Sequence, residues 1–219
     1  MHLKAFAEFL GTALLLISIV GSGIMGETLS QGNDAIALLA NAIATGCMLY
    51  CIITILGPVS GAHFNPIVSF AFVLRGELAL STAILFISAQ ILGGICGVGL
   101  THAMFDQSIF QLSQTDRSGA NLWISEVFAS TGLLCVIFGG LASNPKAIPA
   151  LVGVYITGAY WFTSSTSFAN PAVSIARSLT NTFAGINPTD VSMFIACQFV
   201  GLAIGHVIVR FLFTNQQEA

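Results

Sequence analysis

The charged residues of the chain are widely spaced, and the uncharged stretches between them are long enough to cross a bilayer. A transmembrane helix needs about 20 apolar residues to cross a hydrocarbon core of roughly 30 Å. Four of the six long stretches hold one such helix each, whereas two have about 20 and about 10 residues left over. The stretches comprise residues 9–26, 35–74, 78–105, 127–145, 147–176 and 191–209.

Composition supports the membrane interpretation. Charged residues make up 7% of the 219 positions, apolar residues make up 55%, and the net charge is −3, whereas soluble domains carry roughly 25% charged residues. This composition excludes a soluble domain, a disordered chain and a nucleic-acid-binding protein. Because backbone in lipid must satisfy its own hydrogen bonds, we expect an all-α integral membrane protein with six transmembrane helices in a single domain, residues 1–219.

The N-terminal stretch resembles a signal peptide in being apolar after a basic residue, but Glu8 interrupts it and no small-residue cleavage site follows. We therefore expect it to be the first transmembrane helix. The positive-inside rule then favours cytoplasmic N and C termini. The absence of an N-x-S/T sequon with x other than Pro and the compact length favour a bacterial inner membrane. With this orientation the basic residues on the cytoplasmic side are Lys4, Arg75, Lys146 and Arg210, and those outside are Arg117 and Arg177.

Three short segments recur in the same order in the two halves of the chain. Each half then has three spans, an odd number, so the copies are expected to be inverted relative to one another. The predicted repeats cover residues 1–105 and 119–214. The matching segments are 7–10 with 125–128, 64–69 with 169–174, and 88–93 with 196–201.

Each of the two overlong stretches contains an Asn-Pro pair. An Asn side chain caps a helix N-terminus, and Pro suits the first helical position because no amide hydrogen is needed there. The pairs therefore predict short helices that start at Pro66 and Pro171, each about ten residues or 15 Å long, half the membrane thickness. Taken singly, either pair could also cap an ordinary surface loop. Paired by an inverted repeat, the two helix N-termini should meet near the bilayer midplane.

Two facing N-termini place positive dipole ends at one point and repel cations, while the amide groups of Asn65 and Asn170 donate hydrogen bonds. Non-helical backbone is tolerated at this depth only where it is buried or lines a wet cavity, so the carbonyls of the preceding loops are expected to line a pore. The predicted midplane residues are Asn65, Pro66, Ile67, Asn170, Pro171 and Ala172, and the pore-lining loop residues are Gly61, Ala62, His63, Phe64, Thr166, Phe168 and Ala169.

These motifs resemble the aquaporin and aquaglyceroporin family, also called the major intrinsic proteins. The resemblance covers nearly the whole chain and is carried by residues 7–12, 60–66 and 170–172 and by Gln90 with the glycines that follow it. It implies six transmembrane helices, two re-entrant half-helices, a homotetramer with a pore in each subunit, and passive conduction of water or small uncharged solutes.

Two positions depart from the family pattern. Ile67 stands where the family usually has Ala, which is expected to alter packing more than chemistry. Val173 stands where members that pass water or glycerol carry a filter Arg, and Arg177 lies about 6 Å further along the half-helix, too far to take its place. An ungapped alignment puts Thr45, Gly158 and Ser167 at the other filter positions. All four residues are small, so a wide constriction is expected.

Wide filters without a charge resemble those of a bacterial branch linked with arsenic resistance, whose implied substrates are arsenite and related metalloid hydroxides. The sequence therefore predicts a passive channel for such hydroxides, glycerol-like polyols and water in the lipid bilayer. A strict water channel, an ion-coupled secondary transporter and a tetrameric scaffold with a closed pore remain as alternatives.

Acids within a membrane, such as Glu8 and Glu126, by default indicate a proton relay or an ion site. Because the two occupy matching positions of the repeat, we favour a supporting role in which each accepts hydrogen bonds from a re-entrant loop. His63 either edges the pore or has a purely structural role. The five cysteines lack metal-binding spacing, and G-x-S-x-G, P-loop and HExxH motifs are absent. We expect no catalytic residues, no metal site and no cofactor, and hence no enzyme.

Overall fold

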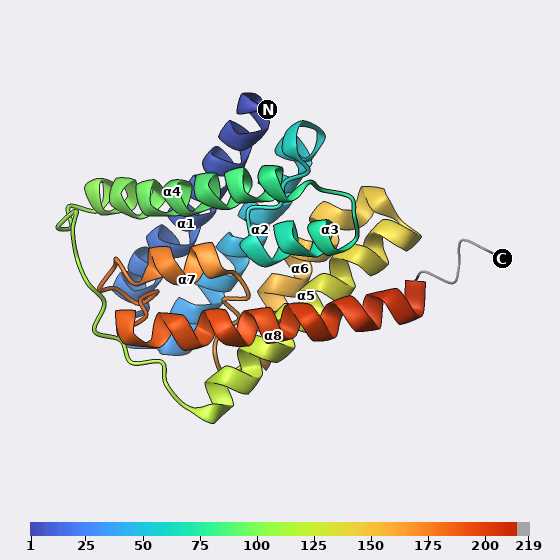
Figure 1. Cartoon of the computed structure of the whole chain (residues 1–219). Coiled ribbons are helices and arrows are strands. Elements are labelled where there is room, and N and C mark those ends of the chain that lie inside the picture. The colour runs from blue at the N-terminus through green and yellow to red at the C-terminus, as the bar shows by residue number, and fades with distance from the viewer. Residues whose placement is uncertain (214–219) are drawn as a thin grey trace.

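The computed structural model describes residues 1–213 and contains only helices within that range. Residue 214, the last of the predicted second repeat, lies outside the described residues. Six longer helices and two short ones follow one another along the chain (Figure 1). They are α1 (His2–Ser30), α2 (Asp34–Ser60), α3 (Pro66–Leu74), α4 (Leu80–Met104), α5 (Ala120–Ser143), α6 (Ile148–Phe162), α7 (Pro171–Arg177) and α8 (Pro188–Phe213), with a 3₁₀ turn at Pro145–Ala147 before α6.

Five of the longer helices, α1, α2, α4, α5 and α8, are long and apolar enough to cross a membrane. The sixth, α6, has 15 residues, which at 1.5 Å per residue extend about 22 Å. The all-α membrane class predicted from the uncharged stretches is confirmed, with a shorter helix at the fifth span.

The two short helices begin at the Asn-Pro pairs, as predicted. The side-chain oxygen of Asn65 accepts from the backbone N–H of Ile67, and that of Asn170 accepts from the N–H groups of Ala172 and Val173. Proline occupies the first helical position in both cases. With 9 and 7 residues, α3 and α7 extend about 14 and 11 Å, less than half of a bilayer core.

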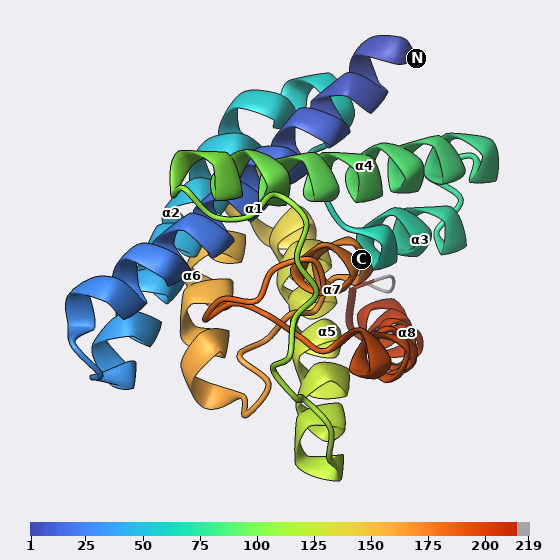
Figure 2. The same cartoon turned by 90° about the vertical axis from the view of Figure 1, so that its left-hand side faces the viewer.

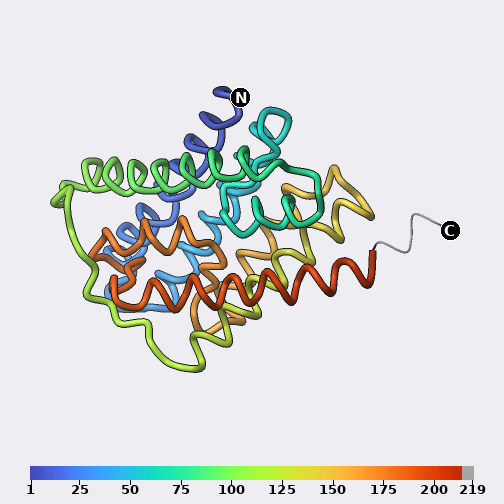
Figure 3. The backbone as a smooth tube through the Cα atoms, in the orientation of Figure 1, coloured from blue at the N-terminus to red at the C-terminus, as the bar shows by residue number. Residues whose placement is uncertain are grey.

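The halves are related by the same set of contacts. α1 packs on α2 and α4, and α5 packs correspondingly on α6 and α8. The short helices lie between α4 and α8, where α3 contacts α8, α7 contacts α4, and the two also contact each other (Figure 2). The tube trace shows how the loops before α3 and α7 turn back into the centre of the bundle (Figure 3). Each half thereby inserts its short helix against the other half.

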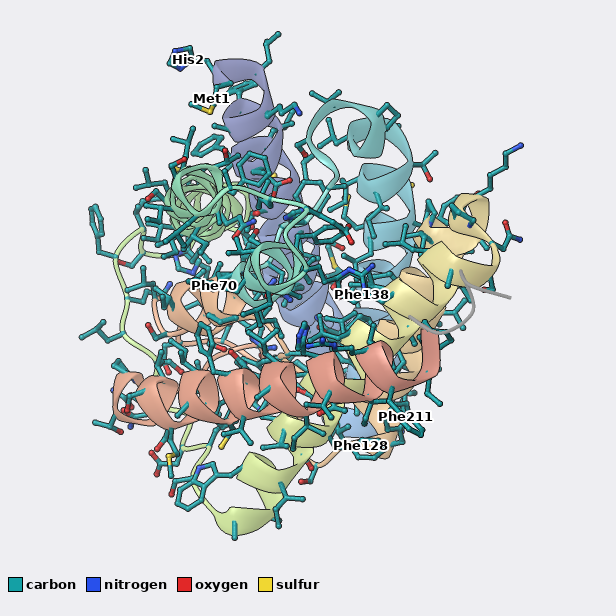
Figure 4. The ribbon with its side chains drawn as sticks, turned by 45° about the vertical axis from the view of Figure 1, so that its right-hand side comes forward. Met1, His2, Phe70, Phe128, Phe138 and Phe211 are labelled. Carbon is teal, nitrogen blue, oxygen red and sulfur yellow. The ribbon has the colours of Figure 1, made fainter. Side chains whose placement is uncertain are left out.

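Glycines allow the closest helix crossings. A Cβ at Gly97 of α4 would lie 2.4 Å from the carbonyl oxygen of Ala13 in α1, and one at Gly201 of α8 would lie 2.6 Å from that of Val127 in α5. Small residues at such positions let membrane helices approach closely. The outer surface carries large apolar side chains instead, such as Phe128 and Phe211, which are 62% and 77% exposed (Figure 4).

A Gly97→Val substitution is expected to destabilise the α1–α4 crossing, because backbone atoms of Ala13 cannot move aside as a side chain can. Overpacking of this kind costs about 1–3 kcal/mol, which a thermal unfolding curve in detergent should show as a lower midpoint. Gly99→Val on the same helix is the matched control, since its nearest neighbour is a side-chain atom of Ile109 at 3.9 Å. Equal midpoints for the two variants would contradict this account of the crossing.

Candidate functional site: a pore between the repeats

A cavity in the centre of the bundle is lined by residues of both repeats. It offers about 110 Å³ to water-sized molecules, and since roughly 10–15 Å³ suffices for one water, it has room for several waters or a small solute. Apolar lining residues come from all the contributing helices and from both loops, whereas the polar ones come from α2, α6, α7 and the two loops. The polar lining residues include Thr45, His63, Asn65, Tyr160, Ser167, Asn170 and Arg177.

The two capping asparagines cross-link the loops at the centre of the pore. Asn65 Nδ2 donates to the carbonyl oxygen of Ala169 at 2.7 Å, and Asn170 Nδ2 donates to that of Phe64 at 2.8 Å. An amide NH₂ has two hydrogens, and within residues 1–213 no protein acceptor takes the second one of either asparagine. Both side chains line the cavity, so each retains one donor for a passing solute.

Glu8 holds the first loop from α1. Its carboxylate accepts from Ser60 Oγ at 2.6 Å, from the backbone N–H groups of His63 and Phe64 at 3.0 and 2.7 Å, and from Gln90 Nε2 at 2.8 Å. The side chain has no exposed surface. Four donors and no acceptor around the two oxygens fit an ionised carboxylate.

Glu126 makes the equivalent contacts in the second repeat. It accepts from Ser165 Oγ at 2.6 Å, from the N–H groups of Phe168 and Ala169, both at 2.9 Å, and from Gln198 Nε2 at 2.7 Å. It too has no exposed surface. The two acids thus have the same four kinds of partner. Apart from Ser60, the last residue of α2, these partners belong to a re-entrant loop or are a glutamine that also bonds the adjacent short helix.

The loops achieve this geometry with left-handed backbone at matched positions. Ala62 and Phe64 have φ of 52° and 49°, and Ser167 and Ala169 have φ of 51° and 47°. Left-handed backbone is costly for residues other than glycine and persists where surrounding contacts fix it. With the N–H groups turned to the carboxylates, the carbonyls of Ala62 and Ser167 receive no hydrogen bond from residues 1–213. Because both residues line the cavity, these carbonyls are available to solute.

Three of the four predicted filter residues line the cavity, namely Thr45, Ser167 and Val173. The part of the cavity lined by α7 and the loop that precedes it is called the α7 mouth below. Thr45 Oγ1 lies 3.2 Å from Tyr160 Oη, whereas Ser167 Oγ is buried without a hydrogen-bond partner in the described chain.

Gly158, the fourth predicted filter residue, is not among the residues that line the cavity, and its place in the filter stays a prediction. The lining residues of α6 are Ile148, Val152, Ile156 and Tyr160, spaced four apart on one face. Gly158 lies two residues from the last two of these, on the opposite face of the helix. The phenol of Tyr160 is thus the α6 lining group that precedes the second loop most closely.

Arg177 also lines the α7 mouth, although it is not among the predicted filter residues. It is 2% exposed, its Nε donates to the carbonyl oxygen of Ala184, and its Cζ lies 3.5 Å from the centroid of the Phe168 ring. A signal was present in the sequence, because Arg177 follows Val173 by four residues and so shares its helix face.

The other predicted residues divide into two groups. His63 lines the cavity while its Nδ1 lies 3.0 Å from Ser69 Oγ and its ring stacks on Phe72, so it has both a pore contact and a structural contact. Most other predicted loop residues also line the cavity, but Thr166 does not. Pro66, Ile67, Pro171 and Ala172 are buried in the short helices behind the lining surface.

Comparison with known proteins identifies the class. The family model described as "Major intrinsic protein" matches residues 2–160. The chain is 48% identical to Aquaglyceroporin AqpS of Rhizobium meliloti (strain 1021) over 95% of this chain and 89% of the relative. It is 38% identical to Probable aquaporin PIP2-8 of Oryza sativa subsp. japonica, over 67% of this chain and 54% of that protein.

The fold has a solved counterpart. The structure of the aquaglyceroporin from Plasmodium falciparum superposes with a TM-score of 0.73 and 18% identity, covering 95% of this chain and 94% of the other. The chain therefore has the aquaporin fold, and it belongs to the major intrinsic protein family, whose members are membrane channels.

A Glu126→Gln substitution is expected to weaken both the fold and transport, because the new amide presents an NH₂ group to partners that are all donors. A buried donor left without an acceptor costs about 1–3 kcal/mol. Glu27→Gln, at an exposed position of α1, is the control for removal of one charge. Thermal unfolding in detergent should separate the two variants, and an E126Q protein as stable as E27Q would refute the support role.

Proposed function

We propose that this protein is a passive channel for small uncharged solutes, and that its substrates are metalloid hydroxides such as As(OH)₃, glycerol-like polyols and water. The observation that carries the proposal is the set of polar groups that line the otherwise largely apolar cavity. The set consists of the asparagine amides, the loop carbonyls beside them, and the hydroxyls of Thr45, Tyr160 and Ser167. Such groups replace the hydrogen bonds that a hydroxylated solute gives up on leaving water.

Val173 at the filter position favours solutes larger than water. A valine has a shorter side chain than the arginine of the family pattern and brings neither charge nor hydrogen-bond donors. The Tyr160 hydroxyl lies close to Thr45 and adds a polar group to the cavity wall. The name of the bacterial relative, an aquaglyceroporin, supports the same class of solute. The choice of arsenite rests on the resemblance to arsenic-resistance channels.

Ion-coupled transport is less well supported. Coupling to protons or sodium requires acids that can exchange partners facing the pathway. Glu8 and Glu126 are each occupied by four donors from the loops and from a glutamine, and neither lines the cavity. A strict water channel stays as the nearest alternative, since it would use the same midplane groups.

We further propose that the channel works as a homotetramer in a bacterial inner membrane, with both termini in the cytoplasm. The positions of the basic residues and the family resemblance support this arrangement.

Stopped-flow light scattering of proteoliposomes tests the function directly. We expect glycerol and As(OH)₃ to enter protein-containing vesicles faster than empty ones, and at a rate that an imposed proton or sodium gradient does not change. Accumulation against a concentration gradient when the ion gradient is applied would establish coupling instead. Water permeability without any glycerol or arsenite permeability would establish the strict water channel.

A Val173→Arg substitution tests the filter assignment. The new side chain narrows the pore and adds a fixed charge, so the flux of glycerol and As(OH)₃ should fall by at least about tenfold, the effect of roughly 1.4 kcal/mol on the barrier, while water flux falls less. Val154→Arg, at an exposed position on α6, controls for insertion of an additional arginine. An unchanged ratio of glycerol to water flux in V173R would remove Val173 from the filter.

A further inference from the structure

The Arg177 side chain is a buried cation with no carboxylate partner. It lies 2% exposed at the α7 mouth, and the single ion pair among residues 1–213 joins Arg75 to Glu77 elsewhere. Buried charges in proteins are usually paired, because an uncompensated one is expensive to keep away from water. The partial compensation present comes from the carbonyl oxygen of Ala184 and from the face of the Phe168 ring.

The guanidinium still has donors to offer. Of its five N–H groups, the one on Nε is taken by Ala184, and no protein acceptor in residues 1–213 takes the four on the terminal nitrogens. Ser167, which precedes Phe168 in the loop, provides an independent sign of a ligand position. Its Oγ is buried, lines the same cavity, and has no partner in the described chain.

A second arginine, Arg117, also contacts Phe168. The Arg117 guanidinium lies 5.1 Å from the Phe168 ring centroid, its Nε donates to the carbonyl oxygen of Gly185, and its backbone N–H donates to Asp190 Oδ2. Burial lowers the pKa of Arg117, although an arginine stays protonated at neutral pH. Phe168 thus contacts two guanidiniums, and of the two arginines Arg177 is the one that lines the cavity.

We propose that Arg177 is the specificity-determining cation of this pore, placed one helical turn along from the wide Val173 position, where it excludes small cations while its free donors and the Ser167 hydroxyl receive the oxygens of neutral solutes. Val173 and Arg177 lie on one face of α7, separated by about 6 Å along its axis. Size selection and charge selection therefore occupy two successive levels of the pore. The inference rests on the proposed function, because it concerns the selectivity of the same channel.

The expected magnitude follows from Coulomb's law. A unit charge about 6 Å from a guanidinium, through an effective dielectric constant near 20, meets a repulsion that slows its passage roughly a hundredfold. The half-helix N-termini at the midplane add a separate barrier that changes at position 177 leave in place.

Urea and guanidinium make a suitable probe pair, since they have nearly the same planar shape and differ in charge. In proteoliposomes the flux ratio of guanidinium to urea should rise by roughly ten- to a hundredfold in Arg177→Gln. The Arg177→Lys variant keeps the charge and should keep the low ratio of the parent. Arg210→Gln, an exposed arginine of α8, controls for the loss of one positive charge.

A folded R177Q protein with the same guanidinium-to-urea flux ratio as the parent would overturn the proposal. A ratio in R177K as high as that in R177Q would also overturn it. If R177Q does not fold, the parent is compared with V173R. If the parent and V173R have the same low flux ratio of guanidinium to urea, the result supports Arg177 as the charge that excludes cations. If the ratio is at least about tenfold lower in V173R than in the parent, the parent lacks such a charge and the proposal is overturned. Failure of the proposed function looks different, because the parent would then pass no urea at all.

Discussion

The pore depends on two buried carboxylates that take up the backbone N–H groups of the re-entrant loops. Without Glu8 and Glu126, the chain between α2 and α3 and between α6 and α7 would carry unsatisfied donors at membrane depth, which lipid does not tolerate. With them, the N–H groups turn outward to the protein and the carbonyls turn inward to the lumen. The left-handed residues in both loops are stabilised by the same contacts.

From that constraint the rest of the site follows. The fixed loops place Asn65 and Asn170 so that each caps its own short helix through its oxygen and ties the opposite loop through its nitrogen. The two repeats are therefore joined by side-chain hydrogen bonds at their centre as well as by the helix contacts around it. The remaining amide hydrogens and the helix dipoles give this point a positive potential, which suits neutral solutes and opposes cations.

The general architecture was open to prediction because its causes are local. Long uncharged stretches define the spanning helices, an Asn-Pro pair is a complete start signal for a helix, and the repeat of Glu8 in Glu126 indicates the same task in both halves. The α7 mouth was harder. Counting residues back from Val173 without gaps leads to Gly158, whereas the α6 residue nearest to that loop that lines the cavity is Tyr160. Likewise, the direction of the Arg177 side chain depends on Phe168 and Ala184, which its own helix sequence does not reveal.

The central claim is that two half-helices meet near the bilayer midplane beside a hydrated pore with a positive electrostatic potential. A density map of the protein in a lipid nanodisc, at a resolution that shows ordered solvent, tests it most directly. The account predicts a water or solute within hydrogen-bond distance of Nδ2 of both Asn65 and Asn170, with α3 and α7 inside the membrane layer. A map in which either short helix lies on the membrane surface, or in which a protein side chain fills the space between the two amides, would contradict it.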